Sequence, residues 1–173
     1  MAHSYTHAQL VLLAYRWVMR SGRAAVAFRE LVTQAMETPD VIAFGGPVQS
    51  ILIECKISRA DFLADRQKLG RVNPGMGMGS HRIYCVPEGL LALEELPSKW
   101  ALLSVAPTGK CTLTFRADPS WPEAVFLSHV FAQQRDERGE TKMLVSALRR
   151  LQRLGVVEQL YAAGLNNSPP SPV

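Results

Sequence analysis

The stretch SILIECKIS, residues 50–58, decides how this sequence is interpreted. Its aliphatic residues are typical of a buried strand, yet Glu54 and Lys56 stand in its middle. Because side chains of a strand alternate between two faces, Cys55 and the isoleucines share one apolar face, whereas Leu52, Glu54 and Lys56 share the other. Burying one of these charges alone is costly in free energy. The pair therefore indicates either an ordinary ion pair on a half-exposed sheet or a functional site.

The rest of the chain supplies neighbours for this strand, as hydrophobic periodicity and turn residues show. In chain order we expect a helix over 7–20, strands over 24–32, 41–44 and 50–57, a helix over 58–70, a loop over 71–80, a strand over 81–87, a short helical turn over 88–96, strands over 100–106 and 111–117, and helices over 122–135 and 140–163. This order, α-β-β-β-α-β-(α)-β-β followed by helices, predicts a mixed α/β sheet flanked by helices.

A second acid lies just upstream, in TPDVIAF, residues 38–44. Asp40 begins the preceding strand, and the short connection GGPVQ makes the two strands a hairpin that brings Asp40 beside Glu54. Two carboxylates and a lysine suit divalent-metal chemistry on phosphate. We expect Asp40, Glu54 and the backbone carbonyl of Cys55 to bind Mg²⁺ or Mn²⁺. Lys56 would orient or help deprotonate the attacking water.

The pair Pro39-Asp40 followed by Glu54-Cys55-Lys56 resembles the motif of the PD-(D/E)XK nuclease superfamily. The stretches ECKISRADFLADRQK, GMGSHRIYCVPEGLL and EELPSKWALLSV are also similar to small phage and bacterial members, including the MmcB-like DNA-repair group. This resemblance covers about residues 7–107. It implies a restriction-endonuclease-like core in αβββαβ order and metal-dependent hydrolysis of DNA, with RNA not excluded as a substrate.

The resemblance also implies further site residues. An additional acid joins the site in many members, and Glu30 is the preferred candidate here over Glu37, although a solvated edge charge explains Glu30 equally well. Five basic residues are candidate contacts to nucleic acid: Arg59, Lys68, Arg71, His81 and Arg82. The last three flank the glycine-rich loop PGMGMGS, which could close over a nucleic-acid backbone or be a plain surface loop.

The composition is that of an ordinary globular chain of 173 residues, with 47% hydrophobic residues and a net charge of +4 that permits nucleic-acid binding. Three cysteines without close spacing favour reduced thiols, and no segment is apolar enough to span a membrane, so we expect a cytoplasmic protein.

Three segments follow from this interpretation: a nuclease-like core over 1–118, a helical extension over 119–163 and a disordered tail over 164–173. The extension packs on the core or forms a homodimer, and its basic cluster Arg149, Arg150 and Arg153 either touches phosphate or merely solvates the helix. Two alternatives to catalysis remain on the same fold: an inactive nucleic-acid-binding module and a regulatory partner protein.

Overall fold

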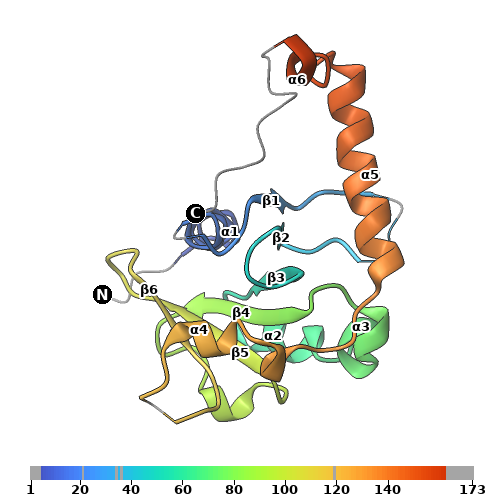
Figure 1. Ribbon diagram of the computed structural model, residues 1–173. Coiled ribbons are helices and arrows are strands. Elements are labelled where there is room, and N and C mark those ends of the chain that lie inside the picture. Colours follow the sequence, from blue (N-terminus) through green and yellow to red (C-terminus); the bar gives the residue numbers. More distant parts are fainter. Residues whose placement is uncertain (1–4, 21, 34, 36, 119, 163–173) are drawn as a thin grey trace.

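The computed structural model describes residues 5–20, 22–33, 35, 37–118 and 120–162 (Figure 1). Its centre is one six-stranded sheet in which the strands lie in chain order. The strands are β1 (Val26–Arg29), β2 (Val41–Phe44), β3 (Ser50–Cys55), β4 (His81–Pro87), β5 (Trp100–Val105) and β6 (Cys111–Thr114). β3, β4 and β5 run parallel, and the outer pairs run antiparallel. The predicted mixed α/β sheet flanked by helices is confirmed.

One face of the sheet is dry and is covered by α1 (His7–Val18). Thr6 caps this helix, since its hydroxyl accepts the N–H of Gln9. Leu10, Ala14 and Trp17 pack from α1 against alternate residues of β3 and β4. The apolar face predicted for residues 51–55 is therefore the α1 side, whereas Ile57 lies beyond the strand and is exposed.

The opposite face carries the charges and is covered by α2 (Arg59–Asp65) and by the first turns of α5 (Glu137–Arg153). Ser58 caps α2, with its hydroxyl accepting the N–H of Asp61. The predicted helix over 58–70 is wrong in its second half. The chain leaves the helix after Asp65, turns, and forms α3 (Leu69–Val72) before the short 3₁₀ helix η1 (Pro74–Met76).

The loop over 71–80 is more ordered than its glycines predict, because it is fixed at both ends. Gly79 has a φ of +83°, and a Cβ there would meet the Cβ of Leu52 at 2.4 Å. Only glycine fits this approach of the loop to β3. Beyond β4, the short turn predicted over 88–96 is observed as η2 (Leu93–Glu95).

The predicted helix over 122–135 is wrong. The segment instead forms α4 (Glu123–Phe126) and the 3₁₀ helix η3 (His129–Phe131). Phe126 and Phe131 turn into the core and contact each other and Phe115, so tertiary packing overrides the helical pattern.

The predicted helix over 140–163 begins earlier and is interrupted. α5 starts at Glu137, ends at Arg153 before Gly155, whose φ is +69°, and is followed by α6 (Gln159–Ala162). Its first turns are anchored, because buried Glu140 accepts hydrogen bonds from Ser50 and Gly79. Its later turns project from the body of the molecule (Figure 1). The tail predicted over 164–173 lies outside the described residues. No described helix is both long and apolar enough to cross a bilayer.

Candidate metal and phosphate site

Asp40 lies against the Glu54–Lys56 segment. The antiparallel register pairs Val41 with Ile53, so Asp40 continues β2 at the position opposite Glu54. Its carboxylate Oδ2 accepts the backbone N–H of Cys55, at 2.7 Å. The hairpin thus places Asp40 beside Cys55, the residue between Glu54 and Lys56.

Glu54 and Lys56 are buried, with only 2% and 4% of their surfaces exposed. Lys56 Nζ lies 3.1 Å from Glu54 Oε2 and 3.3 Å from Asp65 Oδ1. The two charges therefore do form an ion pair, as the simpler interpretation predicted, but one that includes a further acid. That further acid, Asp65, is the last residue of α2 and is only 1% exposed.

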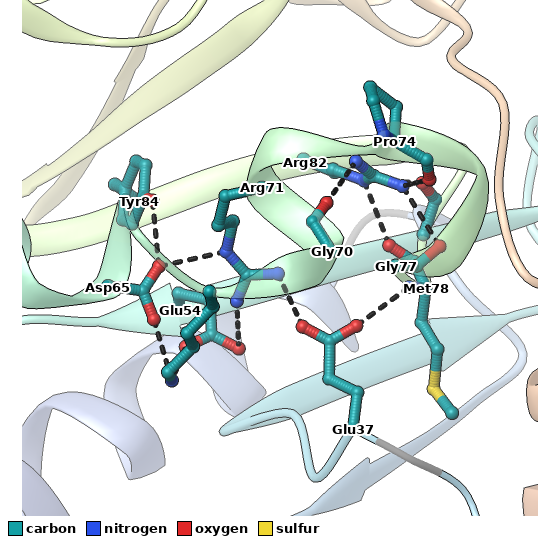
Figure 2. A network of polar contacts seen from close by, with 12 residues as sticks. Glu37, Glu54, Asp65, Gly70, Arg71, Pro74, Gly77, Met78, Arg82 and Tyr84 are labelled. Carbon is teal, nitrogen blue, oxygen red and sulfur yellow. Dashed lines mark hydrogen bonds and ion pairs between the residues drawn. The ribbon is translucent and has the colours of Figure 1, made fainter.

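Arg71 completes a charge network that consists of Glu37, Glu54, Lys56, Asp65 and Arg71 (Figure 2). Its guanidinium contacts three carboxylates: Nη2 lies 3.1 Å from Glu54, Nε lies 2.8 Å from Asp65, and Nη1 pairs with Glu37. The turn after α2 makes this possible, since it returns the chain from Asp65 to α3. The Tyr84 hydroxyl also donates to Asp65, at 2.8 Å.

Burial and neighbouring charges set the protonation of this network. Burial raises the pKa of Glu54 to about 7, with Arg71 acting against it and Asp40 adding to it. Burial also acts to raise the pKa of Asp65, but Arg71, Lys68 and Lys56 together hold that pKa well below its usual range. For Lys56, burial is outweighed by the surrounding carboxylates, so its pKa is raised and it stays an ammonium.

A second cluster lies on the accessible side of Asp40. His7 Nε2 is 3.3 Å from Asp40 Oδ2, and His7 Nδ1 is 3.8 Å from Glu30 Oε1. One ligand atom from each of the three residues lies within 4.8 Å of the others. The side chains are 38%, 57% and 16% exposed for His7, Glu30 and Asp40, so a solvated ion can reach them.

Backbone geometry fixes this second cluster. The N–H of Glu30 donates to the carbonyl of Asp40, at 3.0 Å, which closes the base of the β1–β2 connection. Glu30 has a φ of +46°, an uncommon conformation for a residue other than glycine. Sequence reasoning missed His7, because a histidine in the first turn of a helix gives no local signal of its tertiary partners.

Solvent also approaches the network from the side of α3. A cavity of about 270 Å³ opens there, and Glu37 and Lys68 lie on its wall. Lys68 Nζ is 2.7 Å from Asp65 and 4.0 Å from Glu54, while its side chain stays more than half exposed. Of the five predicted nucleic-acid contacts, Lys68 is the one that the structure brings next to the candidate site with its side chain accessible.

The other four predicted contacts have other partners. Arg59 is exposed but pairs with Glu95, and Arg71 is buried in the charge network. His81 is buried, with Nε2 at 2.9 Å from the carbonyl of Ser128. Arg82 is fully buried. Its guanidinium donates to six backbone carbonyl oxygens, those of Gly70, Pro74, Gly77, Met78, Gly79 and Gln134. Figure 2 shows the first four of these acceptors.

These placements correct the phosphate-contact hypothesis for His81 and Arg82. Both side chains are buried among protein partners, so neither is offered to a polynucleotide in this structure. Arg82 holds the glycine-rich loop in place through these hydrogen bonds, so the structure does not support a loop that closes over a ligand. We call Arg82 and its six carbonyl acceptors the loop anchor.

Comparisons with known proteins leave the function to be argued from this geometry. No family model matches the sequence, and no curated protein matches it significantly. Among solved structures, a chain described as the SPO1766 protein of unknown function from Silicibacter pomeroyi is similar at 25% identity, over 77% of this chain and 81% of that chain, with a TM-score of 0.47.

Proposed function

We propose that this chain is a metal-dependent nuclease that hydrolyses phosphodiester bonds in DNA. One observation carries the proposal: the carboxylate of Asp40 accepts a hydrogen bond from the backbone N–H of Cys55, the residue between Glu54 and Lys56. This is the juxtaposition that the resemblance to the PD-(D/E)XK superfamily implies. The order α1-β1-β2-β3-α2-β4, with β4 parallel to β3, supports extending the proposal to a restriction-endonuclease-like core.

The donor set fits a divalent ion. Asp40 and Glu30 offer hard oxygen atoms and His7 offers an imidazole nitrogen, whereas Glu54 is paired with Lys56 and Arg71 and lies outside this group. The 3.3 Å between Asp40 Oδ2 and His7 Nε2 is close to the ~3 Å that separates neighbouring ligands on one ion. An imidazole nitrogen in the set favours Mn²⁺ over Mg²⁺, which prefers oxygen alone. Bound there, the ion would polarise a phosphoryl oxygen and lower the pKa of a coordinated water.

Lys56, Asp65 and Arg71 have roles that do not depend on binding the ion directly. Lys56 remains an ammonium because Glu54 and Asp65 flank it, so it donates hydrogen bonds rather than taking a proton. In this role it orients the attacking water and stabilises negative charge on the transferring phosphate. Asp65 and Arg71 are positioning residues, because they fix Lys56 and Glu54 from behind.

The test is cleavage of a panel of labelled single-stranded and duplex DNA, and of RNA, with Mn²⁺, Mg²⁺ or EDTA. We expect DNA cleavage only with metal. Asp40→Asn keeps an oxygen acceptor for the Cys55 N–H but loses the charge, and it should lower the rate about 10²-fold or more, as should Lys56→Met. Exposed Glu88→Gln is the matched control for removal of one acid. Equal cleavage by wild type and Asp40→Asn would reject the proposal.

One observation favours a second candidate, a nucleic-acid-binding module without catalysis. Glu54 and Lys56 are neutralised by residues of the chain and almost completely buried. Retained DNA binding in EDTA, with no cleavage of any substrate in Mn²⁺ and no calorimetric signal for Mn²⁺, would select this candidate.

A further inference from the structure

A basic cleft lies between α5 and the chain that follows β1. It encloses about 590 Å³ and is lined on one side by Val32 and Thr33, and on the other by Lys142, Arg149, Arg150 and Arg153. None of the described residues that line it is acidic. The Arg150 guanidinium donates to the carbonyl of Val32, which joins the two walls.

The cations form a strip along the helix. Lys142, Ser146, Arg149 and Arg153 follow one another at intervals of three or four residues, so they share one face of α5. With a rise of ~1.5 Å per residue, the strip from Lys142 to Arg153 is about 16 Å long. A strip of this length is long enough to contact several successive phosphates of one strand.

A merely solvated face would place acids among these bases. Arg149 and Arg153 are instead a like-charged i, i+4 pair, which is unfavourable in an isolated helix. From residue 141 to residue 162 the sequence contains a single acid, Glu158. Cations gathered in a hollow with no acid on its walls raise the local positive potential and attract a polyanion.

The cleft is connected to the candidate metal site by the chain itself. Val32 is two residues beyond Glu30, so their Cα atoms are at most about 7 Å apart. The backbone hydrogen bond between Glu30 and Asp40 closes the base of the same connection. Figure 1 shows this connection running from β1 across to α5. One wall of the cleft is therefore continuous with the connection that carries Glu30, and Glu30 is hydrogen-bonded to Asp40.

We propose that the cleft between α5 and residues 32–33 binds the phosphate backbone of a polynucleotide and leads it to the Asp40 site. This inference deepens the proposed function, on which its direction toward Asp40 rests. The binding itself involves no metal and no cleavage, so it is measured separately.

The experiment is fluorescence anisotropy with labelled DNA of about 20 nucleotides, single-stranded and duplex, in EDTA between about 50 and 200 mM salt. Arg149→Gln combined with Arg153→Gln removes two exposed cations. We expect it to weaken binding of single strands about tenfold at ~100 mM salt and to reduce the slope of log K against log salt by about 1.4. Arg149→Lys combined with Arg153→Lys keeps the charges and should bind within about twofold of wild type.

The matched control is Arg20→Gln combined with Lys110→Gln, which removes the same charge from exposed positions outside the cleft. Circular dichroism and melting temperature should be unchanged in all three double variants. Wild-type affinity and slope in the Arg149 and Arg153 glutamine variant, or an equal loss in the control, would overturn the inference.

Anionic vesicles of phosphatidylserine and phosphatidylcholine are the competing ligand. If the glutamine variant loses vesicle binding but binds DNA like wild type, the cleft is a lipid surface and the inference is wrong. If wild type binds DNA through the cleft but cleaves nothing with metal, the proposed function fails while the cleft assignment stands.

Discussion

Arg71 and Arg82 lie close together on the same side of the sheet, but their guanidinium groups have different kinds of partner. Arg71 contacts the carboxylates of Glu37, Glu54 and Asp65 (Figure 2), whereas Arg82 donates to backbone carbonyls alone. Both lie near the ring of Trp100, at 5.3 and 6.0 Å from its centroid. The same residue type therefore anchors a loop at one position and sets the charge of a site at the other.

The two environments differ in whether their protonation can change with pH. Backbone carbonyl oxygens do not titrate, so the loop anchor has a single protonation state. The charge network contains a carboxyl group whose pKa is about 7, and Asp40 lies next to it. Such a network can take up a proton near neutral pH, and the proposed metal site at Asp40 lies beside it.

The largest effect is expected from breaking the loop anchor. Arg82→Met should lower the free energy of unfolding by about 4 kcal/mol, because six carbonyl acceptors lose a buried charged donor. Urea unfolding in EDTA measures this, with exposed Arg138→Met as the control for loss of one arginine. Unfolding at the wild-type urea concentration would show that the carbonyls are satisfied without Arg82.

A smaller loss of stability is expected from breaking the charge network. Arg71→Met should cost about 2–3 kcal/mol, because Lys56 and Lys68 still neutralise Asp65 and because Glu54 can take a proton. Adding Glu37→Gln removes one of the acids that Arg71 pairs with, so the double variant should recover part of that loss. A double variant that is as unstable as the sum of the two single variants would contradict this coupling.

The smallest effect concerns His81, the neighbour of Arg82. Burial lowers the pKa of His81 from its ordinary value of 6.5, so near that pH the unfolded chain binds the proton and the folded chain does not. The stability contributed by neutral His81 is therefore present above pH 6.5 and is lost as the pH falls below it.

His81→Gln removes this dependence, and Glu54 contributes the opposite slope equally to both proteins. The difference in unfolding free energy between wild type and His81→Gln should shift against wild type as the pH falls from about 7 to about 5. A difference that stays constant over this range would show that folding does not lower the pKa of His81 and would contradict this prediction.

Sequence patterns predicted the part of the site that depends on residues close together in the chain. Alternation along β3 and the short hairpin connection were enough to bring Asp40 beside Glu54, because both depend on residues close in sequence. The strand over 81–87 was predicted with its observed bounds, because its central residues 83–86 are strand formers and turn residues flank the segment.

The rest depends on tertiary contacts that no local pattern contains. The helix ends after Asp65, and the turn that follows brings Arg71 back to Glu54. No glycine or proline before Gly70 predicts this end. Arg82 at the start of a strand is typical of an exposed cation, and no local pattern shows that the loop just before it folds back so that its carbonyls surround the guanidinium. Phe126 and Phe131 follow a helical pattern in sequence but are used as separate core anchors.

The account rests on a divalent ion at Asp40, and Mn²⁺ titration followed by calorimetry and by the loss of the free-ion EPR signal tests it most directly. We predict that wild type binds one Mn²⁺, that Asp40→Asn weakens this binding tenfold or more, about 1.4 kcal/mol, and that Glu88→Gln does not change it. Absence of Mn²⁺ binding by the folded wild type, or equal affinity in Asp40→Asn, would contradict the account.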